Sequence, residues 1–170
     1  MRRSIAVAVA VAWLLSGHLA WAQKDEAKEH AELAKALSAA KISLQTGLSA
    51  SASAGTPISA KYEVEDGKLQ LSVYTMKGAA LSEVIVDHGT GKVAKTEAIT
   101  SGDDLTAAKA QSEAMAKAKR SLRAVADQAA KENKGYRVVS VTPALKEGHP
   151  VAEVTLVKGG EFKAVSEKLD

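Results

Sequence analysis

Hydrophobic and polar residues alternate along two neighbouring stretches of the chain. In residues 58–65, Ile, Ala, Tyr and Val alternate with Ser, Lys and Glu, and residues 69–74 repeat the pattern with Leu and Val against Gln, Ser and Tyr. A period of two predicts strands with one apolar and one wet face. Asp66-Gly67 between the two stretches is a strong hairpin signal. After a turn near Lys77-Gly78, the β-branched run Val84-Ile85-Val86 predicts a third strand.

Two other stretches have helical spacing. The first predicts a helix from Lys24 to about Gly47, with apolar positions at Leu33, Leu37, Ala40 and Leu44. Gly47 would end this helix, and the small-residue segment 49–57 would follow as a connector. The second predicts one helix from about residue 103 to Asn133, capped by Ser101 or Asp103. Its apolar stripe is Leu105, Ala108, Met115, Leu122, Val125 and Ala129.

The C-terminal third predicts three more strands, at residues 136–141, 150–157 and 161–169, and residues 92–99 predict a fourth strand of the first group. Aligning Lys77-Gly78 with Lys158-Gly159 places Val73 over Val154, Leu81 over Phe162 and Val84 over Val165. We therefore expect an α+β fold with an internal repeat: two tandem units, residues 23–99 and 100–170. Each unit would pack its helix on one face of an antiparallel sheet of three or four strands.

The first 22 residues have the three parts of a secretory signal peptide, namely Arg2-Arg3, an apolar run over residues 5–15 and an Ala20-Trp21-Ala22 site. An apolar run of about ten residues is short for a membrane span. No cysteine follows it, which excludes a lipoprotein anchor. We expect cleavage after Ala22, a periplasmic or secreted protein, and no membrane anchor once the signal is removed.

Composition limits the partners and the kinds of site that this protein can have. Removal of the signal takes away two arginines and no acids, which lowers the net charge from +3 to +1 and makes nucleic acid an unsuitable partner. The chain has no cysteine, so disulfides, thiolate metal sites and cysteine catalysis are excluded. It also has no HExxH motif, Walker loop or Gly-x-Ser-x-Gly elbow. A catalytic triad built from distant residues stays open, but the expectation is a protein without catalytic residues or a cofactor.

The segment Val84–Val93 ends a strand in a glycine-containing turn, Asp87-His88-Gly89-Thr90-Gly91, before Lys92 and Val93 begin a new strand. Asp87 can accept backbone N–H groups of the turn, and Gly89 and Gly91 can adopt positive φ. With a helix and two strands before it, this segment resembles the end of a PepSY domain, whose last strand runs into Asp-x-x-Thr-Gly-Lys-Val. The resemblance covers roughly residues 30–97 and, more weakly, 105–170. Asp87, Thr90, Gly91 and Lys92 correspond to turn positions of that family.

The resemblance implies an exported, non-enzymatic module that binds a secreted or envelope protein and regulates or inhibits a peptidase. The candidate partner face is the wet side of the first hairpin: Lys61, Glu63, Glu65, Gln70 and Tyr74.

The alternative is a periplasmic protein that binds a small ligand or a metal ion, motivated by Glu26 and His30 at helical spacing. A solvated pair is the simpler interpretation of those two residues. The basic residues Lys117, Lys119, Arg120 and Arg123 similarly predict either an anion-binding patch or a solvated helix face.

Overall fold

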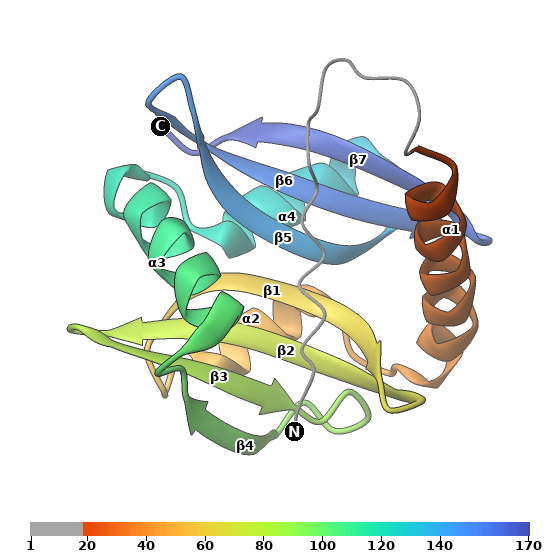
Figure 1. Cartoon of the computed structure of the whole chain (residues 1–170), viewed down its shortest axis with the longest axis horizontal. Coiled ribbons are helices and arrows are strands. Elements are labelled where there is room, and N and C mark those ends of the chain that lie inside the picture. Colours follow the sequence, from red (N-terminus) through yellow and green to blue (C-terminus); the bar gives the residue numbers. More distant parts are fainter. Residues whose placement is uncertain (1–18) are drawn as a thin grey trace.

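A seven-stranded antiparallel sheet is the centre of the molecule (Figure 1). The computed structural model describes the backbone of residues 19–170 and the side chains of residues 26–170. The expected signal peptide therefore lies outside the described residues except for its last four, which begin the first helix. The helices are α1 (Leu19–Ala36), the 3-10 turn η1 (Leu37–Ala39), α2 (Leu44–Ser51), α3 (Gly102–Lys117) and α4 (Leu122–Glu132). The strands are β1 (Thr56–Glu65), β2 (Lys68–Lys77), β3 (Ala80–Val86), β4 (Val93–Ala98), β5 (Arg137–Lys146), β6 (His149–Lys158) and β7 (Glu161–Lys168).

The strands form one sheet in the order β4-β3-β2-β1-β5-β6-β7, and each neighbouring pair is antiparallel. β1 and β5 join the two halves through a short stretch, with Ala60 opposite Val141 and Lys61 opposite Ser140. The α+β class and the antiparallel sheet are confirmed. The sheet is continuous across both halves, whereas the sequence suggested a separate sheet for each.

Helices cover both faces of this sheet, which corrects the expectation that they would share one side. α2 and α4 pack on the face that carries the main core (Figure 1). α3 lies on the opposite face, where Ala108 packs against Ile58, Tyr74 and Leu81. The sheet face opposite the main core is therefore apolar at one end, and burial of that apolar patch holds α3 there.

The expected helix over residues 24–47 is interrupted, and Gly47 does not end it. The 3-10 turn η1 follows α1, and Ala40 has extended backbone angles. Ser43 then caps α2, with its Oγ accepting a hydrogen bond from the Thr46 N–H at 3.1 Å. Gly47 is buried inside α2, and Leu71 packs so closely on it that an added Cβ would lie 2.5 Å from a Leu71 methyl carbon. The expected connector over 49–57 is accordingly shortened at both ends, by α2 and by β1.

The second expected helix is also two helices. α3 ends at Lys117, and Ser121 caps α4 by accepting a hydrogen bond from the Ala124 N–H at 3.2 Å. Between them, the N–H groups of Lys119 and Arg120 bond to the Leu169 carbonyl at 2.7 and 3.0 Å. This contact with the C-terminal end breaks a stretch whose composition favours continuous helix. Ser101 occupies the N-cap position of α3 but makes no capping hydrogen bond through its side chain.

The β2–β3 and β6–β7 hairpins occupy corresponding places in the two halves. Lys77 pairs with Ala80 across one turn, and Lys158 pairs with Glu161 across the other. Val73 opposite Val84 matches Val154 opposite Val165, and all but the last of these four valines are fully buried. Among the described residues, no helix is long and apolar enough to cross a membrane.

Arg137 ties the second half of the chain to the first. Its guanidinium donates hydrogen bonds to the carbonyls of Leu37, at 3.1 Å, and Ile42, at 2.6 Å. The same group lies 5.1 Å from the centre of the Tyr62 ring, and the Tyr62 hydroxyl donates to the Ile42 carbonyl at 2.9 Å. Burial raises the pKa of Tyr62, and the nearby Arg137 charge partly opposes that rise. These contacts fix the segment between α1 and α2 against the sheet.

Candidate functional site

The turn after β3 is closed by Asp87. Its Oδ1 accepts hydrogen bonds from the Gly89 N–H at 2.9 Å, the Thr90 N–H at 2.7 Å and the Thr90 hydroxyl at 3.0 Å. The Asp87 carbonyl accepts from the Gly91 N–H at 2.8 Å, and the Asp87 N–H donates to the Lys92 carbonyl at 2.8 Å. The hydrogen bonds to Oδ1, led by the one from the Thr90 backbone N–H, lower the pKa of Asp87. Gly91 has φ of 76°, whereas Gly89 keeps a negative φ, contrary to expectation.

This turn also supports the segment that precedes α2. The His88 carbonyl accepts hydrogen bonds from the N–H groups of Lys41 and Ile42, at 2.9 and 3.2 Å. Gly91 lies beside Ile42 and Thr46, where an added Cβ would be at ordinary contact distance. His88 is half-buried, and its Nδ1 has no hydrogen-bond partner among the residues that the structure describes. The turn residues Asp87, Thr90, Gly91 and Lys92 therefore hold β3, β4 and the start of α2 together, and their contacts are structural.

The candidate partner face lies on the side of the sheet that faces away from α2 and α4. Glu63 pairs with Gln70, and Glu65 pairs with Lys68 beside the turn of the hairpin. Lys61 Nζ lies 2.7 Å from Glu63 Oε2. Four of the five expected residues, Lys61, Glu63, Glu65 and Gln70, are thus brought together on one partly open surface.

Tyr74, the fifth expected residue, is not available to a partner. It is 7% exposed and lies under α3, where its hydroxyl donates a 2.7 Å hydrogen bond to Asp104 Oδ1. Burial and the Asp104 carboxylate together raise the pKa of Tyr74 far above its ordinary value. Tyr74 therefore forms the boundary between the open part of this face and the part that α3 covers.

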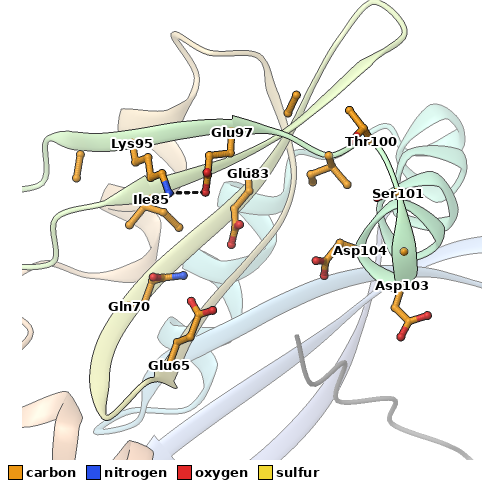
Figure 2. A pocket seen from close by; sticks show the side chains of 14 residues that line it. Glu65, Gln70, Glu83, Ile85, Lys95, Glu97, Thr100, Ser101, Asp103 and Asp104 are labelled. Carbon is orange, nitrogen blue, oxygen red and sulfur yellow. Dashed lines mark ion pairs between the residues drawn. The ribbon is translucent and has the colours of Figure 1, made fainter. Parts of the chain in front are cut away.

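Beside this boundary the face is hollowed (Figure 2). The hollow has a volume of about 770 Å³ and lies between the β1–β4 strands and the start of α3. Figure 2 shows Glu65, Glu83 and Asp104 pointing into the same space from β1, β3 and α3. Five carboxylates and one lysine line it: Glu65, Glu83, Glu97, Asp103, Asp104 and Lys95. Its electrostatic character is therefore acidic, and it suits a positively charged group.

Ser72 links two carboxylates at the floor of this face. The Ser72 side chain is buried, and its Oγ accepts a hydrogen bond from Gln70 Nε2 at 2.9 Å. The same Oγ lies 2.9 Å from Glu63 Oε1 and 2.8 Å from Glu83 Oε1. A hydroxyl has one proton to donate, so only one of these carboxylates can receive it. The second contact is a hydrogen bond only if that carboxyl group is itself protonated.

Glu83 is the carboxyl group that holds this proton more readily. Its burial raises its pKa, and the negative charge of Glu63 raises it further, although the Ser72 hydroxyl and Lys61 act in the opposite direction. Glu63, by contrast, forms an ion pair with Lys61 through its Oε2. A protonated Glu83 would donate to Ser72, and Ser72 would donate to the Glu63 carboxylate. Glu83 can therefore stay protonated at pH values above the ordinary carboxyl pKa.

The metal-binding alternative gains no support from the histidines. The His30 ring stacks on Phe162, with the ring centres 4.0 Å apart and the planes 6° from parallel. His149 Nδ1 lies 3.4 Å from Asp170 Oδ2 on an exposed surface. Within the part of the chain that the structure describes, no group of three or more histidine, aspartate or glutamate side chains is arranged to hold a metal ion.

Two of the four basic residues of the second helical stretch, Arg120 and Arg123, bind other groups of the fold. Arg120 donates to the Lys168 carbonyl at 2.8 Å and also to Gln128. Arg123 donates to Ser49 Oγ at 2.8 Å, and its Nε lies 3.7 Å from Asp127. These contacts favour the interpretation as an ordinary helix surface over an anion-binding patch.

Sequence reasoning missed Glu83, Lys95, Glu97 and Asp104 as members of the polar face. For Glu83 the signal was present, because Val84 and Val86 point to the core and their neighbour must point to the opposite face. Asp104 had no role in the predicted helix cap, which was Ser101 or Asp103. Its place in the hollow depends on the path of α3 across the sheet, which local sequence does not specify.

No protein-family model, curated protein or solved structure matches this chain.

Proposed function

We propose that this protein is an exported, non-enzymatic binding module that contacts another protein through the polar face of its sheet and thereby regulates or inhibits a peptidase. The observation that carries the proposal is the acidic hollow beside Glu65, Glu83 and Asp104, which is open on a sheet face that α3 covers only at one end. A partner that presents a basic segment would complement its charge.

The resemblance to PepSY domains supplies the more specific part of this proposal. The residues that carry it are Asp87, Thr90, Gly91 and Lys92, whose contacts shape the turn beside β4. The corresponding β2–β3 and β6–β7 hairpins support the related proposal that residues 23–99 and 100–170 are two copies of one unit. The predicted signal peptide supports export to the periplasm or beyond.

The test compares two charge reversals on the intact protein. Glu65→Lys changes the acidic hollow, whereas Glu113→Lys makes the same change on an exposed position of α3 outside it. The wild-type protein and both variants are immobilised, envelope extract is passed over them, and each retained protein is assayed for peptide cleavage with and without the soluble module.

We expect a peptidase that is retained and slowed by the wild-type protein and by Glu113→Lys, with both effects weakened by Glu65→Lys. The proposal is overturned if no peptidase is retained or slowed. Equal retention by all three proteins would show that the hollow is not the contact surface.

A further inference from the structure

Among the described strands β4 is the outermost at one end of the sheet, and the direction of its main-chain hydrogen-bonding groups follows from its pairing with β3. Glu97 is opposite Glu83 and Thr96 is opposite Val84, and the Ile99 N–H donates to the Leu81 carbonyl at 2.9 Å. In an antiparallel pair, main-chain groups point alternately toward and away from the neighbouring strand. The main-chain N–H of Ile99 points toward β3, so the main-chain N–H and C=O of Thr96, three residues earlier, point away from β3. Among the described strands, none lies on that side of β4.

The side chains around Thr96 are complementary to those of a second copy of β4 that lies antiparallel to the first. Lys95 precedes Thr96 and Glu97 follows it, and an alanine stands two positions away on each side, at Ala94 and Ala98. If a second copy of β4 lies antiparallel with its Thr96 opposite this Thr96, each Lys95 is opposite a Glu97. Opposite charges at directly facing positions stabilise a strand pair, and alanines at the flanking positions leave no steric conflict.

We propose that two copies of this chain associate edge to edge through β4, related by a two-fold axis at Thr96. The outward N–H of each Thr96 donates a hydrogen bond to the outward C=O of the other Thr96. Lys95 of each copy forms an ion pair with Glu97 of the other. The result is one antiparallel sheet of twice seven strands. The interface is isologous, so it closes at two copies and leaves no repeating contact for a filament.

The Lys95 and Glu97 side chains already lie together on the polar face of the sheet. Lys95 Nζ is 2.7 Å from Glu97 Oε2, and the pair borders the acidic hollow (Figure 2). In the pair of copies this ion pair becomes a group of four alternating charges. Val93, which is 40% exposed on the same strand, would lie near the Ala98 end of the second copy.

The opposite edge of the sheet is less available for the same association. At β7, Arg120 donates to the Lys168 carbonyl at 2.8 Å, and Lys163 Nζ donates to Asn133 Oδ1 at 2.6 Å. The Phe162 ring at the start of that strand is covered by His30. β4 has no corresponding contact with its outward main-chain groups in the part of the chain described.

The experiment measures the mass of the purified protein, expressed from the full chain, by sedimentation equilibrium over a range of concentrations. Lys95→Glu and Glu97→Lys are each tested alone and then mixed in equal amounts. Alone, each variant places like charges opposite each other across the two-fold axis. In the mixed pair, every facing position again has opposite charges. Thr96→Pro removes the outward N–H without disturbing the β3 ladder, since proline is tolerated at such edge positions.

We expect the wild-type protein to form dimers, each charge variant to associate at least about tenfold more weakly, and the mixture to recover dimers. Thr96→Pro should be monomeric, with circular dichroism confirming that it is folded. Glu167→Lys on β7 is the matched control and should dimerise as the wild type does. The inference is overturned if the wild type is monomeric at every concentration, or if mixing fails to restore dimers. Neither result would affect the proposed contact with a peptidase, which concerns the sheet face and is tested separately.

Discussion

The hydroxyl of Tyr74 on β2 donates a 2.7 Å hydrogen bond to the carboxylate of Asp104 in the first turn of α3. Tyr74 also contributes its ring to the small apolar cluster beneath α3, with Ile58, Leu81 and Ala108. One side chain therefore combines an apolar and a polar contact with the same helix. Because Asp104 lines the acidic hollow, this hydrogen bond also sets one wall of the candidate site.

Tyr74→Phe keeps the apolar contact and removes the hydrogen bond. We expect a loss of about 1–2 kcal/mol in the free energy of unfolding, at the low end for a bond to a charged group because Asp104 is partly exposed. Urea unfolding would measure it. Asp104→Asn, which keeps an acceptor for the hydroxyl, should lose less. An unchanged unfolding midpoint in Tyr74→Phe would show that apolar packing alone holds α3 in place.

Glu83→Gln should make the protein more stable near neutral pH. The raised pKa of Glu83 means that the folded state holds its proton more tightly than the unfolded chain does. Stability is therefore lost as pH rises from the ordinary carboxyl pKa through the raised value. The amide of the variant is neutral throughout, so it avoids this loss. We expect a gain of less than about 1 kcal/mol, because solvent screens a group that is only partly buried.

The measurement for Glu83→Gln is thermal or urea unfolding at several pH values. The difference from the wild type should disappear at a pH below the ordinary carboxyl range and grow above it. The control is Glu65→Gln, which removes a charge from the same hollow outside the hydrogen bonds that join Ser72 to Gln70, Glu63 and Glu83. A difference of constant size at all pH values would contradict the assignment of the proton to Glu83.

The hairpins could be predicted from sequence because their signals are local. Asp66 and Gly67 both have positive φ, 50° and 73°, as their residue types suggest for a tight turn. Alternation likewise predicted the face that carries Lys61 and Glu63. The breaks in the two helical stretches could not be predicted in this way. Their composition favours helix throughout, and distant partners, the His88 and Leu169 carbonyls, bond to the N–H groups at the breaks.

The same distinction applies to the candidate site. Residues of one hairpin share a face by periodicity alone, so part of the polar surface was predictable. Glu97 and Asp104 join that surface only because β4 pairs beyond β3 and α3 then crosses to the opposite face of the sheet from α2. The burial of Tyr74 has the same origin. A polar side chain on the outer face of a hairpin looks solvated until the element that covers it is placed.

Arg137→Lys should weaken the connection between the two halves of the chain. The guanidinium reaches the Leu37 and Ile42 carbonyls at the same time, whereas a lysine ammonium is a compact charge that cannot reproduce this fork. We expect a loss of about 1–3 kcal/mol in unfolding free energy, measured by urea denaturation. Arg123→Lys on α4, whose side chain is 61% exposed, is the matched control and should change stability by less than about 0.5 kcal/mol. Equal effects at the two positions would contradict the structural role of Arg137.

Gly47→Ala has two opposing effects on stability, one from helix propensity and one from packing. In an exposed helix the change would stabilise by about 1 kcal/mol. Here the new Cβ would lie 2.5 Å from Leu71 Cδ2, and Leu71 is fully buried, so it cannot move outward. Overpacking of this kind costs about 1–3 kcal/mol, so we expect a net loss of stability.

Leu71→Val provides the test of that cause, because it shortens the side chain that the new methyl meets. Alone it should destabilise by about 1 kcal/mol through lost packing. Combined with Gly47→Ala, the two changes should cost less than the sum of their separate effects, since the smaller side chain makes room for the methyl. Urea unfolding of the two single variants and the double variant measures this coupling. Strict additivity would mean that the two positions do not contact each other, and the glycine would then need another explanation.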